Sequence, residues 1–275
     1  MTPRRRIHPP MLEPAVIDRR RLLLATLLLP AALRAQGSGS VGLVLMHGKQ
    51  DRALGLLAPL ARTIGGHGVR VEGPAMPWAA SRDYDVDYPT ALDEIESAVA
   101  RLRAAGATRV AVGGQSFGAN AALAFAGSGR KVDAVLAIAP GHVPDRWRDH
   151  PRIGASVERA RAMVAAGQGD TRAGFDDLNQ GQTRTVRTTA RIYLSYFDPD
   201  GLGSMPKSAA SIPAPLPLLW IIGRNDRLAA SGPAYAFDKA PRHPKSQYGE
   251  VSGGHLDTVD IGRDEIVRWT LDALA

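Results

Sequence analysis

The chain has 275 residues, no cysteine and a formal net charge of +7, which is enough length for one full-sized domain. The first 35 residues hold seven arginines and two acidic residues, so they carry +5 of that charge and the other 240 residues carry only +2. A body so close to neutral gives no electrostatic basis for binding nucleic acid. The lack of cysteine excludes disulfides, thiolate metal sites and a cysteine nucleophile.

Residues 1–35 have the composition of an export signal. Three arginines at 19–21 precede an uncharged apolar run at 22–33, and small residues follow it. This order is typical of a cleaved signal peptide, and the run is shorter than the roughly 20 residues that span a membrane. We expect a mature chain that begins near Gln36, in the periplasm or outside the cell, with no membrane partner after cleavage.

Two alternatives stay open for this segment. The arginine pair at 19–20 resembles the twin-arginine export signal, so the general secretory route and the twin-arginine route both fit. The segment would otherwise be a buried helix of the folded domain. The prolines and arginines that flank it without any amphipathic pattern disfavour that reading.

From residue 41 onward, short apolar runs alternate with helical patterns. The runs predict strands at Val41–Met46, Val69–Glu72, Arg109–Gly113, Val132–Ala139, Leu216–Ile222 and Ser246–Val251. The periodic segments predict helices at Ala53–Ile64, Tyr88–Ala105, Ala119–Gly127, Pro233–Ala240 and Arg263–Leu274. Such alternation is the pattern of βαβ units, so we expect an α/β fold with a mostly parallel sheet of about six strands and flanking helices.

The alternation stops between residues 142 and 214. This stretch predicts helices at Ser156–Ala166 and Thr185–Phe197 and contains no buried-strand run. An excursion of this length between two strands of one sheet predicts a helical lid over the strand ends. We expect it to be an insertion within a single domain, residues 36–275.

Ser116 stands at the turn between the third predicted strand and the helix that follows it. In Gly114-Gln115-Ser116-Phe117-Gly118, glycines two residues either side of the serine allow neighbouring chain segments to pass closely. A serine on so sharp a turn is held out over the sheet, with the helix N-terminus behind it. We predict that Ser116 is a nucleophile; the alternative is a glycine-rich structural turn.

Two later strand ends carry groups that would activate a serine. Asp226 follows the strand Leu216–Ile222, and His255 follows the last predicted strand in Gly253-Gly254-His255. A neutral His255 could accept the serine proton, while the carboxylate of Asp226 fixes the tautomer of the ring. The alternatives are an Asx-turn aspartate and an ordinary loop histidine. Asp200 is the next candidate for the acid that orients His255.

The order Ser116, Asp226, His255 resembles the nucleophile–acid–base order of the α/β-hydrolase family, and the resemblance covers residues 41–275. It implies a sheet that lacks the family's first two strands, with catalysis at the carboxyl ends of the strands. The first motif strand begins only about five residues into the expected mature chain, which leaves the edge of the sheet open. His47-Gly48 also resembles the family's first strand-end loop. The backbone N–H groups of Lys49 and Phe117 would then form the oxyanion hole.

These expectations define a serine hydrolase that cleaves a small-molecule carboxylic ester through an acyl-enzyme on Ser116. A peptidase or amidase with the same triad is the alternative, and a non-catalytic binding protein on this fold is a further one. We expect neither a cofactor nor a metal, because the aspartates at 83, 85 and 87 lack the glycine turn and the distal glutamate of a calcium loop. The sequence does not determine the oligomeric state.

Four side chains are candidates for contact with the substrate: His47, Gln115, Tyr196 and Phe197. A purely structural role for His47, as a buried residue of its turn, is an equally favoured alternative. Tyr196 and Phe197 form a stripe with Tyr193 at helical spacing, a pattern that more often belongs to a core than to a binding site. If they wall the pocket instead, the lid sets the substrate preference.

Overall fold

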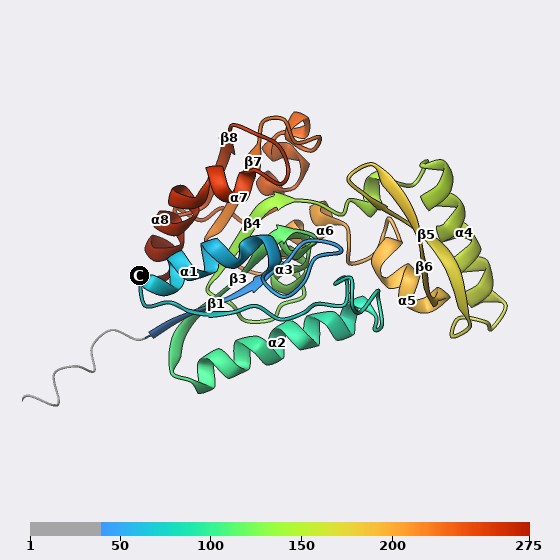
Figure 1. Cartoon of the computed structure of the whole chain (residues 1–275), viewed down its shortest axis with the longest axis horizontal. Coiled ribbons are helices and arrows are strands. Elements are labelled where there is room, and N and C mark those ends of the chain that lie inside the picture. Colours follow the sequence, from blue (N-terminus) through green and yellow to red (C-terminus); the bar gives the residue numbers. More distant parts are fainter. Residues whose placement is uncertain (1–39) are drawn as a thin grey trace, which may run out of the picture. The chain divides into compact units, whose positions relative to one another are not determined.

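A computed structural model describes residues 40–275, which belong to one compact unit (Figure 1). The predicted signal peptide, residues 1–35, and the predicted start of the mature chain at Gln36 lie outside these described residues. Within residues 40–275, no helix combines the length and the apolar character needed to cross a membrane.

The sheet has six strands, all parallel, in the order β2-β1-β3-β4-β7-β8. Their bounds are β1 Ser40–Met46, β2 Arg70–Glu72, β3 Ala107–Ser116, β4 Ala134–Pro140, β7 Leu218–Gly223 and β8 Gln247–Val251. The sequence prediction of a six-stranded parallel sheet is confirmed. The chain leaves β1 toward β2 and returns on the other side as β3. The crevice outside the carboxyl ends of β1 and β3 is therefore a topological switch point, where ligands bind in open α/β sheets.

Helices cover both faces of the sheet (Figure 1). One face packs against α1 (Ala58–Gly66), α7 (Thr258–Ile261) and α8 (Arg263–Leu274), and the other against α2 (Tyr88–Ala104) and α3 (Phe117–Gly127). Side chains alternate between the two faces along β1. Leu43 and Leu45 pack on the face covered by α1, α7 and α8, and Val44 and Met46 pack on the face covered by α2 and α3. Burial on both faces explains why the central strands β1, β3, β4 and β7 contain long apolar runs.

The lid is not helical throughout, and this corrects the prediction. Between β4 and β7 the chain forms α4 (Pro151–Ala165), the strands β5 (Arg172–Asn179) and β6 (Gln182–Thr189), α5 (Ala190–Phe197) and α6 (Met205–Ala210). The two strands pair as an antiparallel hairpin separate from the main sheet. In Figure 1 the hairpin lies with α4 and α5 beyond the carboxyl ends of the main strands.

Three predicted helices need correction. The predicted helix Thr185–Phe197 begins only at Ala190, because residues 185–189 pair with β5. The predicted helix Ala53–Ile64 is a short 3₁₀ helix at Gly55–Leu57 followed by α1. The segment predicted as the helix Pro233–Ala240 forms two 3₁₀ turns instead, interrupted at Ala236, which has non-helical dihedral angles (φ −146°, ψ −37°).

Candidate active site

Ser116 ends β3 and immediately precedes α3, in a strained backbone conformation with φ 58° and ψ −114°. A residue other than glycine adopts positive φ rarely, and such strain clusters at functional sites. The flanking glycines make the turn possible. A Cβ at Gly114 or at Gly118 would lie 2.3 Å or 2.2 Å from the Met46 carbonyl oxygen. The end of β1 therefore packs directly against the serine turn.

His255 and Asp226 form a close, largely buried pair. The Nδ1 of His255 donates to Asp226 Oδ2 over 2.6 Å, and the two side chains are 13% and 6% exposed. The other carboxylate oxygen of Asp226 accepts from the Leu228 N–H at 2.9 Å. With Nδ1 committed to the carboxylate, the proton-accepting nitrogen of the ring is Nε2.

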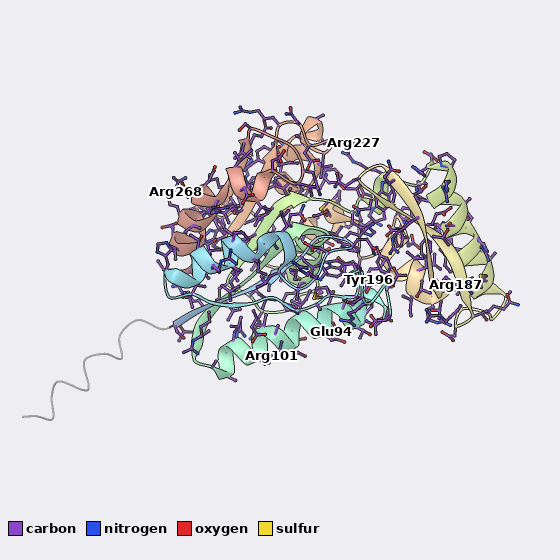
Figure 2. The ribbon with its side chains drawn as sticks, in the orientation of Figure 1. Glu94, Arg101, Arg187, Tyr196, Arg227 and Arg268 are labelled. Atoms are coloured by element: carbon purple, nitrogen blue, oxygen red, sulfur yellow. The ribbon has the colours of Figure 1, made fainter. Side chains whose placement is uncertain are left out.

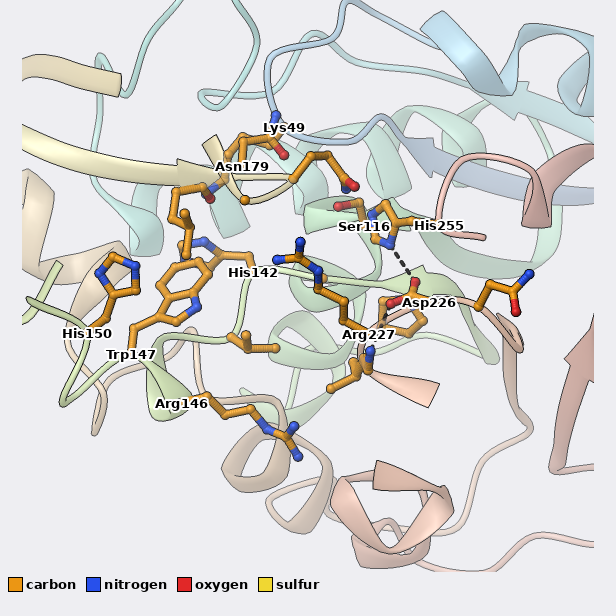
Figure 3. A pocket seen from close by; sticks show the side chains of 18 residues that line it. Lys49, Ser116, His142, Arg146, Trp147, His150, Asn179, Asp226, Arg227 and His255 are labelled. Atoms are coloured by element: carbon orange, nitrogen blue, oxygen red, sulfur yellow. Dashed lines mark hydrogen bonds and ion pairs between the residues drawn. The ribbon is translucent and has the colours of Figure 1, made fainter. Parts of the chain in front are cut away.

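The Nε2 of His255 has no hydrogen-bond partner among the described residues, Ser116 Oγ included. Both groups nevertheless border the same space. A Cβ built on Gly141 would lie 2.7 Å from Ser116 Oγ and 3.5 Å from His255 Nε2. Figure 3 shows the two side chains next to one another at the cavity. Hydrogen bonds between nucleophile and base are often long without substrate and tighten when it binds.

The loop after β1 lies against the serine turn, where the oxyanion hole was predicted. A Cβ on Gly48 would be 3.3 Å from the Cβ of Ser116. The backbone N–H of Lys49 finds no acceptor among residues 40–275. Phe117 is the first residue of α3, and the first N–H groups of a helix lack intrahelical partners. The two predicted donors therefore flank Ser116, from the β1 loop and from the start of α3.

A cavity of about 490 Å³ opens beside the triad, between the sheet and the lid. The sheet side contributes Lys49, Ser116, Pro140, Gly141, Asn225, Asp226, Arg227, Leu228 and His255; the lid side contributes His142, Val143, Arg146, Trp147, His150, Leu178, Asn179, Gln180 and Gly181. Figure 3 shows these side chains around the opening. The size is typical of a pocket for a small molecule.

None of the four predicted contact side chains lines this cavity. His47 is fully buried, donates from Nδ1 to the Gly48 carbonyl and accepts from the Met76 N–H at its Nε2, so it holds the β1 loop in place. Burial lowers the pKa of His47. Gln115 is also buried and donates to the backbone carbonyl of His255 at 3.4 Å. Both side chains shape the loops that carry the site.

Tyr196 and Phe197 lie in the core and not in the pocket wall, which corrects the substrate-contact reading. Their side chains are 0% and 1% exposed. The Tyr196 hydroxyl donates to the Val86 carbonyl at 2.9 Å, and its ring stacks on Tyr88 of α2. Figure 2 shows Tyr196 between α2 and the lid. The helical stripe thus packs the lid onto the sheet body.

A buried ion pair joins the lid to the β1 loop, and sequence analysis missed it. The Nζ of Lys49 lies 2.5 Å from Asp177 Oδ1, and their side chains are 3% and 0% exposed. The same Nζ donates to the Leu178 carbonyl at 3.0 Å, and the Tyr84 hydroxyl donates to the other Asp177 oxygen at 3.1 Å. Burial lowers the pKa of Lys49, which the neighbouring Asp177 opposes. Asp177 belongs to the unpredicted strand β5, so no signal in the sequence paired the two.

His142 follows β4 and was also missed as a cavity residue. Its ring stacks on Phe117 with centroids 3.9 Å apart, and its Nε2 donates to the Tyr196 carbonyl at 2.8 Å. Burial, together with the positive charge of Lys49, holds the pKa of His142 well below its ordinary value. The ring is therefore neutral at neutral pH. Its position directly after a strand end was the available sequence signal.

No protein-family model matches the chain, and no curated protein matches its sequence. Solved structures match its fold. Alpha/beta hydrolase GrgF from Penicillium sp. sh18 has 18% identity and a TM-score of 0.65, over 86% of this chain and 90% of that one. A monoacylglycerol lipase from Paleococcus ferrophilus has 18% identity and a TM-score of 0.63, over 86% and 97%. Est1E from Butyrivibrio proteoclasticus has 13% identity and a TM-score of 0.61, over 87% and 90%.

These likenesses and the sheet order define the class: the chain has the α/β-hydrolase fold, as the order of its motifs implied. At identities below a fifth, the likeness extends to the fold and not to a substrate.

Proposed function

We propose that this protein is a serine hydrolase that cleaves a carboxylic ester through an acyl-enzyme on Ser116. The observation that carries the proposal is the position of Ser116. It stands on a strained strand-to-helix turn, at the wall of a cavity that also holds His255, whose ring is already oriented by Asp226. The monoacylglycerol lipase and the lipolytic enzymes LipS and LipT, whose structures share the fold, support the same class of reaction.

In the proposed reaction, Ser116 Oγ attacks the ester carbonyl carbon while its proton passes to His255 Nε2. The carbonyl oxygen becomes an oxyanion, which the N–H groups of Lys49 and Phe117 stabilise. Collapse of this intermediate breaks the bond to the alcohol oxygen, and His255 returns the proton to the leaving alcohol. Water then repeats the sequence on the acyl-enzyme, releasing the acid and free Ser116. Asp226 stabilises the imidazolium in both halves.

Amide or peptide hydrolysis is the alternative, because the same triad serves both reactions. A non-catalytic binding protein on this fold is less favoured, since all three triad residues are present and two of them already pair. A fluorophosphonate probe separates an active serine from a silent one. We expect it to label the wild-type protein at Ser116 and to leave Ser116→Ala unlabelled. Labelling that persists in Ser116→Ala would assign the nucleophile elsewhere.

A chromogenic panel then tests the substrate class. We expect turnover of nitrophenyl esters of short fatty acids by wild type, loss of that turnover in Ser116→Ala, and much slower hydrolysis of aminoacyl nitroanilides. Faster hydrolysis of the anilides than of the esters would favour the peptidase.

We also propose export to the periplasm or the medium, on the composition of residues 1–35. Intact-mass measurement of protein recovered outside the cytoplasm should show an N-terminus near Gln36. Exported protein that still begins at Met1 or Thr2 would contradict the signal peptide.

A further inference from the structure

The cavity beside the triad has an excess of positive charge. Lys49, Arg146 and Arg227 line it, whereas Asp226 is the single carboxylate among its lining residues. Asp226 is engaged on both oxygens, by His255 and by the Leu228 N–H. The cavity therefore offers cations and no free carboxylate to a bound molecule.

The three cations differ in how far their charge is already balanced. Lys49 is paired with Asp177 behind the cavity wall. Arg146 stacks over the Tyr235 ring at 4.3 Å but forms no ion pair with any residue in the range 40–275. Arg227 has no ion pair and no hydrogen bond with any residue in the described part of the chain, 40–275. Arg146 and Arg227 thus both lack an acidic partner among the described residues, and of the two Arg227 directly follows a triad residue.

Arg227 is also placed to meet a substrate. It directly follows Asp226, so it projects from the same turn that orients His255. Its guanidinium reaches the turn of the lid hairpin, where a Cβ on Gly181 would lie 3.2 Å from both terminal nitrogens. Figure 3 shows the side chain extended across the opening, between the triad and His142. Figure 2 shows Arg227 on the side of the sheet body that faces the hairpin.

Polar groups of the lid surround the same opening. Asn179 and Gln180, at the tip of the hairpin, carry amide donors, and His150 also lines the cavity. A guanidinium presents paired N–H donors that match the two oxygens of a carboxylate. An arginine at a cavity mouth without an acidic partner is therefore suited to an anionic group on the ligand.

We propose that Arg227 binds a carboxylate carried by the ester substrate, so that the enzyme prefers anionic esters over neutral ones of the same size. The inference rests on the proposed esterase function and adds the substrate class to it. The carboxylate belongs either to the acyl chain or to the alcohol, and both positions place it beyond the reacting carbonyl, within the cavity. Because the interaction is charged and near solvent, added salt weakens it.

The test compares matched pairs of esters. For the acyl side the pair is nitrophenyl hexanoate and the mono-nitrophenyl ester of adipic acid. For the alcohol side it is 4-carbamoylphenyl hexanoate and 4-carboxyphenyl hexanoate. The readout is the ratio of kcat/KM for the anionic ester to kcat/KM for the neutral one. We expect Arg227→Gln to lower this ratio about 10-fold for one of the two pairs, the size of a lost charged hydrogen bond. Arg227→Glu should lower it further.

Arg224→Gln is the matched control. Arg224 lies three residues earlier, is exposed, faces Glu250 at 3.9 Å and does not line the cavity. In Arg224→Gln, the ratio of kcat/KM for the anionic ester to that for the neutral ester should stay within about twofold of the wild-type ratio. An unchanged ratio in Arg227→Gln, or an equal fall in Arg224→Gln, would overturn the inference while serine-dependent ester hydrolysis still stood. If wild type hydrolyses no ester and Ser116 takes no fluorophosphonate, the proposed function itself fails.

Discussion

Gly141 lies against the catalytic serine and histidine. A methyl group at position 141 would collide with both side chains. A Cβ at Gly141 would lie 2.7 Å from Ser116 Oγ and 3.1 Å from His255 Cε1. These groups must approach each other for proton transfer, and a displacement of about 1 Å costs roughly 100-fold in rate. We expect Gly141→Ala to lower kcat on a nitrophenyl ester about 100-fold or more.

Gly66→Ala is the control for that variant, because nothing lies within 4 Å of a Cβ at Gly66. It should keep full activity. The unfolding midpoint in urea should change little in either variant. Wild-type kcat in Gly141→Ala would show that serine and histidine meet in an arrangement other than the one observed.

The three triad residues act as one unit in the proposed mechanism. We therefore expect Ser116→Ala and His255→Ala each to lower kcat by about 10⁴ or more, with little further loss when both are combined. Asp226→Asn should cost about 10² to 10⁴, because the ring loses its orienting carboxylate but keeps its position. Single-variant kcat values on one ester give the measurement.

A near-normal rate in Asp226→Asn would show that His255 does not depend on this carboxylate. Asp200, the other acid considered from the sequence, is exposed, pairs with Arg148 and Lys207, and does not line the cavity.

Ser116, Asp226 and His255 could be predicted because each stands at the carboxyl end of a strand or in the loop just after it, and parallel strands bring their carboxyl ends to one edge. The cavity roles of Lys49 and Arg227 could not. Each depends on which lid segment returns over the strand ends, and that contact joins residues far apart in sequence.

The lid hairpin is fixed to the sheet body by Asp177, which meets Lys49 in a space closed to solvent. Removing one partner of a buried pair leaves an uncompensated charge, which costs about 3–5 kcal/mol. We expect Asp177→Asn to lower the free energy of unfolding in urea by about that amount. Asp170→Asn is the control: Asp170 is 84% exposed and pairs with an exposed Arg191, so its loss should be below about 1 kcal/mol.

The double variant Lys49→Met, Asp177→Leu removes both charges of the pair and should recover part of the lost stability. Arg184, whose Nε lies 3.7 Å from Asp177 Oδ2, keeps Asp83 as its partner. Equal stability of Asp177→Asn and wild type would mean that Lys49 reaches water in solution and that the lid is held by its aromatic core alone.

The main sheet was predictable and the hairpin was not, for one reason. The central strands β1, β3, β4 and β7 are mostly buried on both faces and read as apolar runs. In contrast, arginine and aspartate interrupt β5, arginine and threonine interrupt β6, and Phe175 and Val186 are their fully buried apolar residues. The turn did carry a signal. Gln180 and Gly181 adopt φ 49° and 79°, the left-handed pair of a two-residue hairpin turn, for which glycine at the second position is typical.

Across the whole molecule, the sheet body and the lid share one aromatic core around Phe117, and His142 lies inside it. His47 is also buried, and its ring lies beside Trp78, which stacks on Phe117. Burial lowers the pKa of both rings. Both histidines therefore bind a proton less readily in the folded chain than in the unfolded one.

This difference makes stability depend on pH in a definite direction. Below about pH 6.5, the ordinary histidine pKa, the unfolded chain binds protons that the folded chain does not, so stability is full above that pH and is lost as pH falls. Each such histidine contributes up to about 1.4 kcal/mol per pH unit. Urea unfolding at several pH values between about 7.5 and 5.5 should show this slope in wild type. His142→Gln should be less stable at neutral pH but show about half the slope, since His47 remains. Parallel slopes in the two proteins would mean that His142 is protonated within the folded core.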